Sequence, residues 1–156
     1  MKTKLRVIVC GVGFGQFYLR ALERLSDAYE LVGIVSKGSE ISKRYANRYK
    51  VPIITSLESI HKDNVDVACV VINSTLVGGK GSQIVEELLN KGIHVIQEQP
   101  VHINDYIQFL KQAQIHHCRY KLNTFYPDLK IVDRLINMVQ KLNTQASVRY
   151  ITAQCS

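Results

Sequence analysis

Short apolar runs alternate with segments of helical periodicity along most of the chain. The apolar runs are rich in β-branched residues and end in turn-forming residues, a pattern typical of buried parallel strands. They cover residues 5–10, 30–36, 51–54, 66–72, 93–97 and 119–123. Helices are expected at residues 14–25, 40–49, 56–61, 82–91, 104–116 and 128–142. This alternation predicts an α/β fold with a doubly wound, mostly parallel sheet.

The apolar spacing also predicts which face of each helix is buried. The predicted core positions are Phe14, Tyr18, Leu22 and Leu25, then Ile41, Tyr45 and Tyr49, then Ile84, Val85, Leu88 and Leu89, then Ile107 and Leu110, and in the last helix Ile131, Leu135, Met138 and Leu142. Ser39 and Asn104 are expected to cap the helices that follow them, and Gly92 to end the helix before it. The run at 66–72 is the most apolar, so we expect it at the centre of the sheet.

A glycine-rich turn follows the first predicted strand. Gly11, Gly13 and Gly15 leave backbone N–H groups bare just before a helix begins. A strand, a glycine turn and a helix N-terminus together form the usual binding site for the pyrophosphate of a dinucleotide. The fingerprint would place its third glycine where this chain has Gln16, which predicts a slightly displaced helix or a polar side chain facing the cofactor. Taken alone, the turn also fits an ordinary strand-to-helix connection.

Other segments at the same edge of the sheet strengthen the dinucleotide interpretation. Ligands of doubly wound sheets bind beyond the carboxyl ends of the strands. Residues 11–16, 36–39, 73–81 and 97–100 all follow such ends, which indicates a Rossmann-type nucleotide-binding domain. The predicted cofactor-binding residues are Gly11, Gly13, Phe14, Gly15, Gln16, Ser36, Lys37, Gly38, Ser39, Ser74, Thr75, Glu98 and Gln99.

The end of the second predicted strand favours NADP(H) over NAD. Domains that prefer NAD usually place Asp or Glu there, to bind the ribose 2′-hydroxyl. This chain has Ser36, followed by Lys37 and Ser39, so an ammonium, two hydroxyls and a helix N-terminus are available to a phosphate. Arg44 and Lys43, one turn into the next helix, could add to this pocket. Lys37 could instead be a solvated turn residue, and Glu40 could reach back to a ribose.

Composition and charge exclude several classes of partner. The net charge is +7, but the basic residues are spread over all predicted helices without interleaved aromatics, so we expect no nucleic-acid partner. A basic surface suits an anionic cofactor and an acidic protein. No apolar run could span a bilayer and no signal peptide is visible, so we expect a cytoplasmic protein without a membrane partner. The four cysteines show no CxxC spacing, which predicts buried reduced thiols and no metal site.

Five segments together carry a resemblance to a known family. They are residues 10–16, 32–40, 74–82, 92–100 and 123–127. In combination they resemble the glucose–fructose oxidoreductase / inositol dehydrogenase superfamily, whose members typically carry Glu-Lys-Pro after the fifth strand. Here that place reads Glu98-Gln99-Pro100. Within the superfamily the chain is similar to the thiazolinyl imine (imide) reductases of siderophore assembly lines.

The resemblance implies a specific reaction. It is the NADPH-dependent reduction of a thiazoline C=N bond to a thiazolidine, on an intermediate tethered to a carrier domain of a nonribosomal peptide synthetase. It also implies a homodimer for the full-length protein. The alternatives are a sugar or polyol dehydrogenase of the same superfamily and a dinucleotide-binding module without catalysis.

Reduction of an imine requires a positioned acid, because a proton must reach the nitrogen as hydride reaches the carbon. In the wider superfamily the lysine of Glu-Lys-Pro has this role, which the amide of Gln99 cannot take. The catalytic candidates are Tyr126, in a loop before a proline, and Glu98, if burial keeps its carboxyl protonated. Tyr126 could equally be a packed aromatic, and Glu98 a carboxylate bonded to backbone. His94 and His102 are expected to be structural.

The domain organisation follows from the same resemblance. Residues 1–145 are predicted to form the NADP-binding domain, and residues 146–156 the start of a substrate and dimerisation domain that is missing. The alternating pattern at 147–153 reads as the first strand of that second domain. We therefore expect a fragment with little or no turnover by itself, because nothing here shields the site from water.

Overall fold

A computed structural model of the chain describes residues 4–72, 79–124, 129–147 and 149–150. The chain divides into two compact units, residues 1–123 and 124–156. The first unit contains the sheet and most of the helices. The second contains helix α5 (Lys130–Asn143), close to the predicted bounds. The strand expected at 147–153 lies mostly outside the described residues, and the domain limit proposed after residue 145 stays a prediction.

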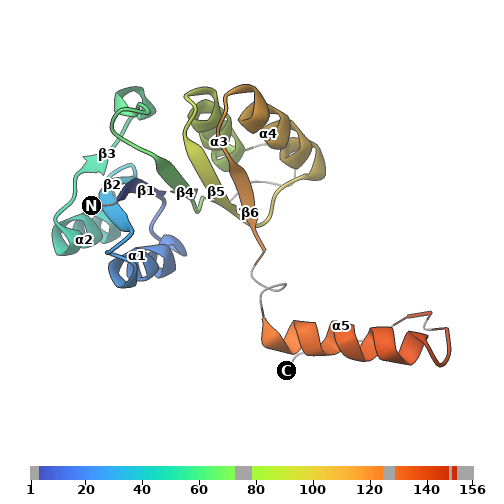
Figure 1. Cartoon of the computed structure of the whole chain (residues 1–156). Coiled ribbons are helices and arrows are strands. Elements are labelled where there is room, and N and C mark those ends of the chain that lie inside the picture. The colour runs from blue at the N-terminus through green and yellow to red at the C-terminus, as the bar shows by residue number, and fades with distance from the viewer. Residues whose placement is uncertain (1–3, 73–78, 125–128, 148, 151–156) are drawn as a thin grey trace. The chain divides into compact units, whose positions relative to one another are not determined.

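The first unit is built on a six-stranded sheet in which every strand pairing is parallel (Figure 1). Its strands are β1 (Leu5–Cys10), β2 (Tyr29–Val35), β3 (Ile53–Ile54), β4 (Val67–Val70), β5 (His94–Glu98) and β6 (Tyr120–Asn123). The order β3-β2-β1-β4-β5-β6 places β1 and β4 at the centre, which confirms the prediction for the apolar run at 66–72. This is the doubly wound Rossmann arrangement, with its crevice at the carboxyl ends of β1 and β4.

Helices cover both faces of the sheet (Figure 1). Helices α1 (Gly15–Arg24) and α2 (Glu40–Tyr49) pack on one face, and α3 (Lys80–Asn90) and α4 (Ile103–Ile115) on the other. The helix expected at 56–61 is a short 3₁₀ turn, η1 (Leu57–Ser59), which packs with α3 and α4. Each face therefore has its own hydrophobic core, and the strands between them are buried on both sides.

The buried face of α1 differs from the prediction. Phe14 and Leu25 are 55% and 52% exposed, whereas Leu19 is fully buried. Tyr18 and Leu22 are partly buried beside it, as expected. Phe14 and Leu25 are the residues that flank the helix at its N- and C-terminal ends, so their side chains lie beyond the stripe that faces the sheet. The prediction is therefore confirmed for the two residues within the helix and wrong for the two that flank it.

Some predicted core positions inside α2 and α4 are also wrong. Ile41 is 52% exposed, and Ala46 is the buried apolar residue of α2. Ile107 and Leu110 are also exposed, while Phe109 is buried in the core of the opposite face. In α3 the prediction is confirmed: Val85, Leu88 and Leu89 are fully buried, and Ile84 is partly buried.

The helix ends follow local rules. The Ser39 hydroxyl accepts a hydrogen bond from the backbone N–H of Ser42, as predicted for an N-cap. At α4 the cap is His102, whose ring accepts from the N–H of Asn104, so the cap predicted at Asn104 is wrong. Gly92 follows α3 with φ +72°, the left-handed conformation expected there. Helix α3 begins at Lys80, earlier than the predicted residue 82.

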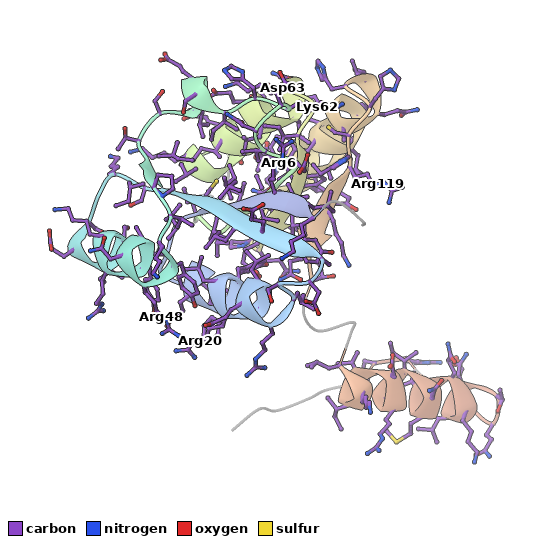
Figure 2. All side chains as sticks on the ribbon, turned by 60° about the vertical axis from the view of Figure 1, so that its left-hand side comes forward. Arg6, Arg20, Arg48, Lys62, Asp63 and Arg119 are labelled. Atoms are coloured by element: carbon purple, nitrogen blue, oxygen red, sulfur yellow. The ribbon has the colours of Figure 1, made fainter. Side chains whose placement is uncertain are left out.

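An ion pair ties the start of β1 to the turn before β4. Asp66 accepts hydrogen bonds from the backbone N–H of Arg6 at 2.7 Å and from its guanidinium at 2.8 and 3.0 Å. The guanidinium also donates to the backbone carbonyls of Lys62 and Asp63, toward which Arg6 points (Figure 2). Hydrogen bonding from Arg6 lowers the pKa of Asp66 below its usual 3.8.

Replacing this carboxylate should cost stability in a pH-dependent way. Because the pKa of Asp66 is lowered in the folded state, its contribution is complete above pH 3.8 and is lost as the pH falls through the folded value. We expect Asp66→Asn to lower the free energy of unfolding by about 1–2 kcal/mol at pH 7. The deficit should shrink below about pH 4, as measured by urea denaturation across pH. Asp63→Asn is the control, since Asp63 contacts Arg6 through its carbonyl, and a deficit that stays constant with pH would contradict the assignment.

Candidate functional site

The carboxyl-end edge of the sheet brings several predicted segments together. A pocket of about 190 Å³ lies there, lined by Phe14, Val71, Ile72, Glu98 and Gln99. It joins the glycine turn after β1 to the ends of β4 and β5, as the topology predicts. A larger hollow of about 660 Å³, near the amino ends of β1 and β2, contains none of the predicted site residues. Ser74, Thr75 and Tyr126 lie outside the described residues.

Gly11 and Gly13 have different roles in the glycine turn. Gly11 has φ +88°, and a Cβ there would lie 2.9 Å from Cγ1 of Ile72 and 3.0 Å from the carbonyl oxygen of Val71. Gly13 is exposed, and a Cβ there would meet no atom within 4 Å. Gly11 therefore shapes the backbone, whereas Gly13 leaves open space in front of it. Helix α1 starts beside this space with no capping side chain and no acidic residue in its first turn. The turn thus fits a pyrophosphate.

The third glycine of the fingerprint is displaced by one position. A Cβ on Gly15 would lie 3.1 Å from Cγ1 of Val9, so Gly15 allows the close approach of α1 to β1. Gln16 takes a different role. Its amide nitrogen donates to the carbonyl oxygen of Gly13 at 3.0 Å, and its amide oxygen accepts from the Tyr45 hydroxyl at 3.1 Å. Gln16 therefore braces the glycine turn against α2.

The loop after β2 is held by hydroxyl groups. The buried Ser42 hydroxyl lies 2.6 Å from that of Ser36 and 2.8 Å from that of Ser39. The backbone N–H of Gly38, which has φ +85°, donates to the Ser36 hydroxyl at 3.2 Å. Lys37 lies exposed at the tip of this loop. The loop therefore presents one ammonium group on a fixed backbone.

Glu40 and Lys43, two residues of α2 that could affect the cofactor preference, form an ion pair with each other. The Glu40 carboxylate lies 2.7 Å from the Lys43 ammonium. Neither lines the pocket beside the glycine turn. In this structure the Glu40 carboxylate is therefore engaged by Lys43.

Glu98 ends β5 within a hydrogen-bonded group of three side chains. Its Oε2 accepts from the Tyr18 hydroxyl at 2.5 Å and from Nδ2 of Asn123 at 2.9 Å, and that same Nδ2 lies 2.6 Å from the Tyr18 oxygen. Burial, followed by the bond to Glu98, raises the pKa of Tyr18, so its phenol stays protonated. Tyr18 and Asn123 are not among the site residues predicted from the sequence. The signal for Tyr18 was a phenol on a buried helix face, which needs a polar partner.

The sequence profile of an oxidoreductase family with an NAD-binding Rossmann fold, GFO/IDH/MocA, matches residues 5–124. The chain belongs to this family. That match covers the sheet and the pocket described above, and it agrees with the superfamily resemblance of the sequence. No functionally curated protein matches the chain.

Solved structures share the fold of the GFO/IDH/MocA domain. One is GenD2 from gentamicin A biosynthesis in complex with NAD, at 17% identity and a TM-score of 0.75, covering 89% of this chain and 40% of GenD2. Another is KijD10, a 3-ketoreductase from Actinomadura kijaniata in complex with NADP and TDP-benzene, at 20% identity and 0.75, covering 89% and 43%. A third is myo-inositol 2-dehydrogenase from Lactobacillus plantarum, at 17% and 0.71, covering 92% and 43%. The chain spans less than half the length of each.

Gln99 is the notable departure from the usual Glu-Lys-Pro pattern of GFO/IDH/MocA proteins. It lines the pocket beside Glu98, and its backbone N–H donates to Oε1 of Glu98 at 3.4 Å. A carboxamide neither loses nor gains a proton at working pH. The position at which the family pattern has an ammonium therefore holds a neutral group here.

The remaining candidates for chemistry are structural. His94 accepts from the backbone N–H of Arg119 at 2.9 Å, and His102 caps α4 as described above. Cys10 and Cys69 are buried free thiols, and burial raises the pKa of both, that of Cys69 to about 12. Among the residues that the structure describes, no group of His, Cys, Asp and Glu could hold a metal ion. No helix in the same residues is long and apolar enough to cross a membrane.

Proposed function

We propose that the chain is the cofactor-binding part of an NADPH-dependent reductase that converts a thiazoline C=N bond to a thiazolidine. The substrate would be an intermediate of siderophore biosynthesis, tethered to a carrier domain of a nonribosomal peptide synthetase. The observation that carries this proposal is Gln99, which lines the 190 Å³ pocket where the family pattern has a lysine. Interconversion of alcohols and ketones needs an acid or base at the oxygen, and this carboxamide supplies neither.

The residues of the first unit fit the binding of NADPH. The bare backbone at Gly13 and the N-terminus of α1 would hold the pyrophosphate, and Ser36 with Lys37 would hold the 2′-phosphate. When bound, NADPH supplies the hydride. Phe14 and Gln99 line the adjoining pocket. A nitrogen of a C=N bond accepts a proton more readily than a carbonyl oxygen, so the reduction does not require an ammonium at the position of Gln99.

That acid is assigned to Tyr126 within this proposal. Both side-chain hydrogen bonds at Glu98 end on its Oε2, which accepts from Tyr18 and from Asn123. Glu98 instead joins the end of β5 to α1 and β6 through Tyr18 and Asn123. Tyr126 follows β6 closely in the chain, although its own position lies outside the described residues.

The carrier domain is proposed as a partner because of the net charge of the chain. The net charge of +7 suits the acidic surface expected of a carrier domain, and a homodimer is proposed for the full-length protein. The solved structures named above are too distant in sequence to bear on the substrate, and their names describe those proteins only. A cytoplasmic location belongs to the same proposal.

The test compares cofactors and substrates. Titration calorimetry of the chain should show binding of NADPH in preference to NADH. The full-length protein should consume NADPH when it is given a thiazoline thioester on a carrier domain, and should leave myo-inositol and glucose unoxidised with NADP. Oxidation of a polyol without reduction of the thiazoline would overturn the proposed substrate. Absence of binding of either cofactor would overturn the proposal as a whole.

A further inference from the structure

A second lysine lies beside Lys37 at the carboxyl-end edge of the sheet. It is Lys80, the first residue of α3. Lys37 follows β2, and Lys80 comes after β4. Since β2 and β4 are the two neighbours of β1, the two lysines come from loops on either side of the glycine turn. The two side chains interact closely enough that this interaction, including charge repulsion, lowers the pKa of Lys80.

This pairing of like charges has no counterion in the described part of the chain. The ion pairs found there involve other lysines, such as Lys43 with Glu40 and Lys91 with Glu87. The first turn of α3 contains no acidic residue, and Gly79 at its N-cap offers no side chain to the free N–H groups. Two ammonium groups and a helix N-terminus therefore share one exposed region. Their mutual repulsion is unfavourable unless an anion lies between them.

We propose that Lys37 and Lys80 together hold the 2′-phosphate of NADPH, which makes Lys80 a residue that determines the preference for NADPH over NADH. This inference rests on the proposed function. A phosphate monoester carries close to two negative charges and three acceptor oxygens, so it can accept hydrogen bonds from both ammonium groups at once. NADH lacks this phosphate and leaves the repulsion between the lysines in place. Lys80 therefore stabilises bound NADPH but not bound NADH.

The experiment measures affinity for the cofactors and for their adenosine fragments. The chain and its Lys80→Ala variant are titrated with NADPH, NADH, 2′,5′-ADP and 5′-AMP. Removal of the ammonium should weaken binding of NADPH and 2′,5′-ADP about tenfold, the usual effect of losing one charged hydrogen bond. Binding of NADH and 5′-AMP should stay within about twofold, because Lys80 makes its contact with the phosphate alone. Lys80→Arg should retain most of the NADPH affinity.

The control separates a specific contact from general electrostatics. Lys111→Ala removes the same charge from an exposed position in α4, and it should leave all four affinities unchanged. Lys80 is itself exposed, so its variants are expected to fold, which circular dichroism verifies. If Lys80→Ala weakens NADPH no more than Lys111→Ala, or weakens NADPH and NADH equally, the role of Lys80 is wrong while the proposed function stands. If the unaltered chain binds neither cofactor, the proposed function fails, and this inference with it.

Discussion

Leu19→Ala is expected to lower the free energy of unfolding by about 2–5 kcal/mol, the range for emptying a well-packed leucine site. Leu19 is fully buried and packs in the core between α1, α2 and the sheet, near Val9, Ile34 and Ala46. The strands beneath it are covered on both faces, so they have little freedom to close the cavity. Urea denaturation of the unaltered chain and of Leu19→Ala measures the difference, provided that the unfolding free energy of both depends equally steeply on urea concentration.

Leu25→Ala is the matched control. It removes the same atoms from the same helix, but Leu25 is 52% exposed at the C-cap. We expect a loss of less than about 1 kcal/mol, as for most surface substitutions. A loss for Leu25→Ala as large as that for Leu19→Ala would contradict the burial of Leu19 and the exposure of Leu25 described above.

The strands were predictable because their environment is uniform. A parallel strand buried on both faces reads as an unbroken apolar run, and each run found in the sequence became a strand with bounds that differ by a few residues. The inward faces of the helices were less predictable. Helix α4 carries apolar residues on more than one side, so its spacing permits several stripes. The structure selects Phe109, whose ring centroid lies 5.4 Å from that of Tyr120 on β6, and this fit depends on a distant strand.

The candidate site likewise has a part that the sequence predicts and a part that it does not. The glycine turn and the loop after β2 are local, so their chemistry could be predicted from consecutive residues. The bonds among Tyr18, Glu98 and Asn123 join α1, β5 and β6, and Tyr18 and Asn123 are 105 positions apart in the chain. The contact between Lys37 and Lys80 likewise depends on the order of strands in the sheet. Contacts of this kind follow from topology, which a single sequence specifies only through the whole fold.

Gly13→Ala is expected to weaken NADPH binding at least about tenfold while leaving the melting temperature unchanged. A Cβ at this position meets no protein atom within 4 Å, so the folded chain tolerates it. The same methyl group occupies the space in which a pyrophosphate must approach the bare backbone of the turn, and loss of that close approach removes hydrogen bonds to a charged group. Titration calorimetry and thermal unfolding of the variant measure the two effects separately.

Gly11→Ala should show the opposite pattern, and the contrast tests the assignment of the turn. Its φ of +88° and the short distances to Ile72 and Val71 make a side chain costly for folding, by about 1–3 kcal/mol. The part of Gly11→Ala that remains folded should bind NADPH more tightly than Gly13→Ala does, because the backbone at Gly13 is still bare. If Gly13→Ala bound NADPH as tightly as the unaltered chain, the pyrophosphate would not lie over this turn. The cofactor would then have to bind somewhere other than the crevice between β1 and β4.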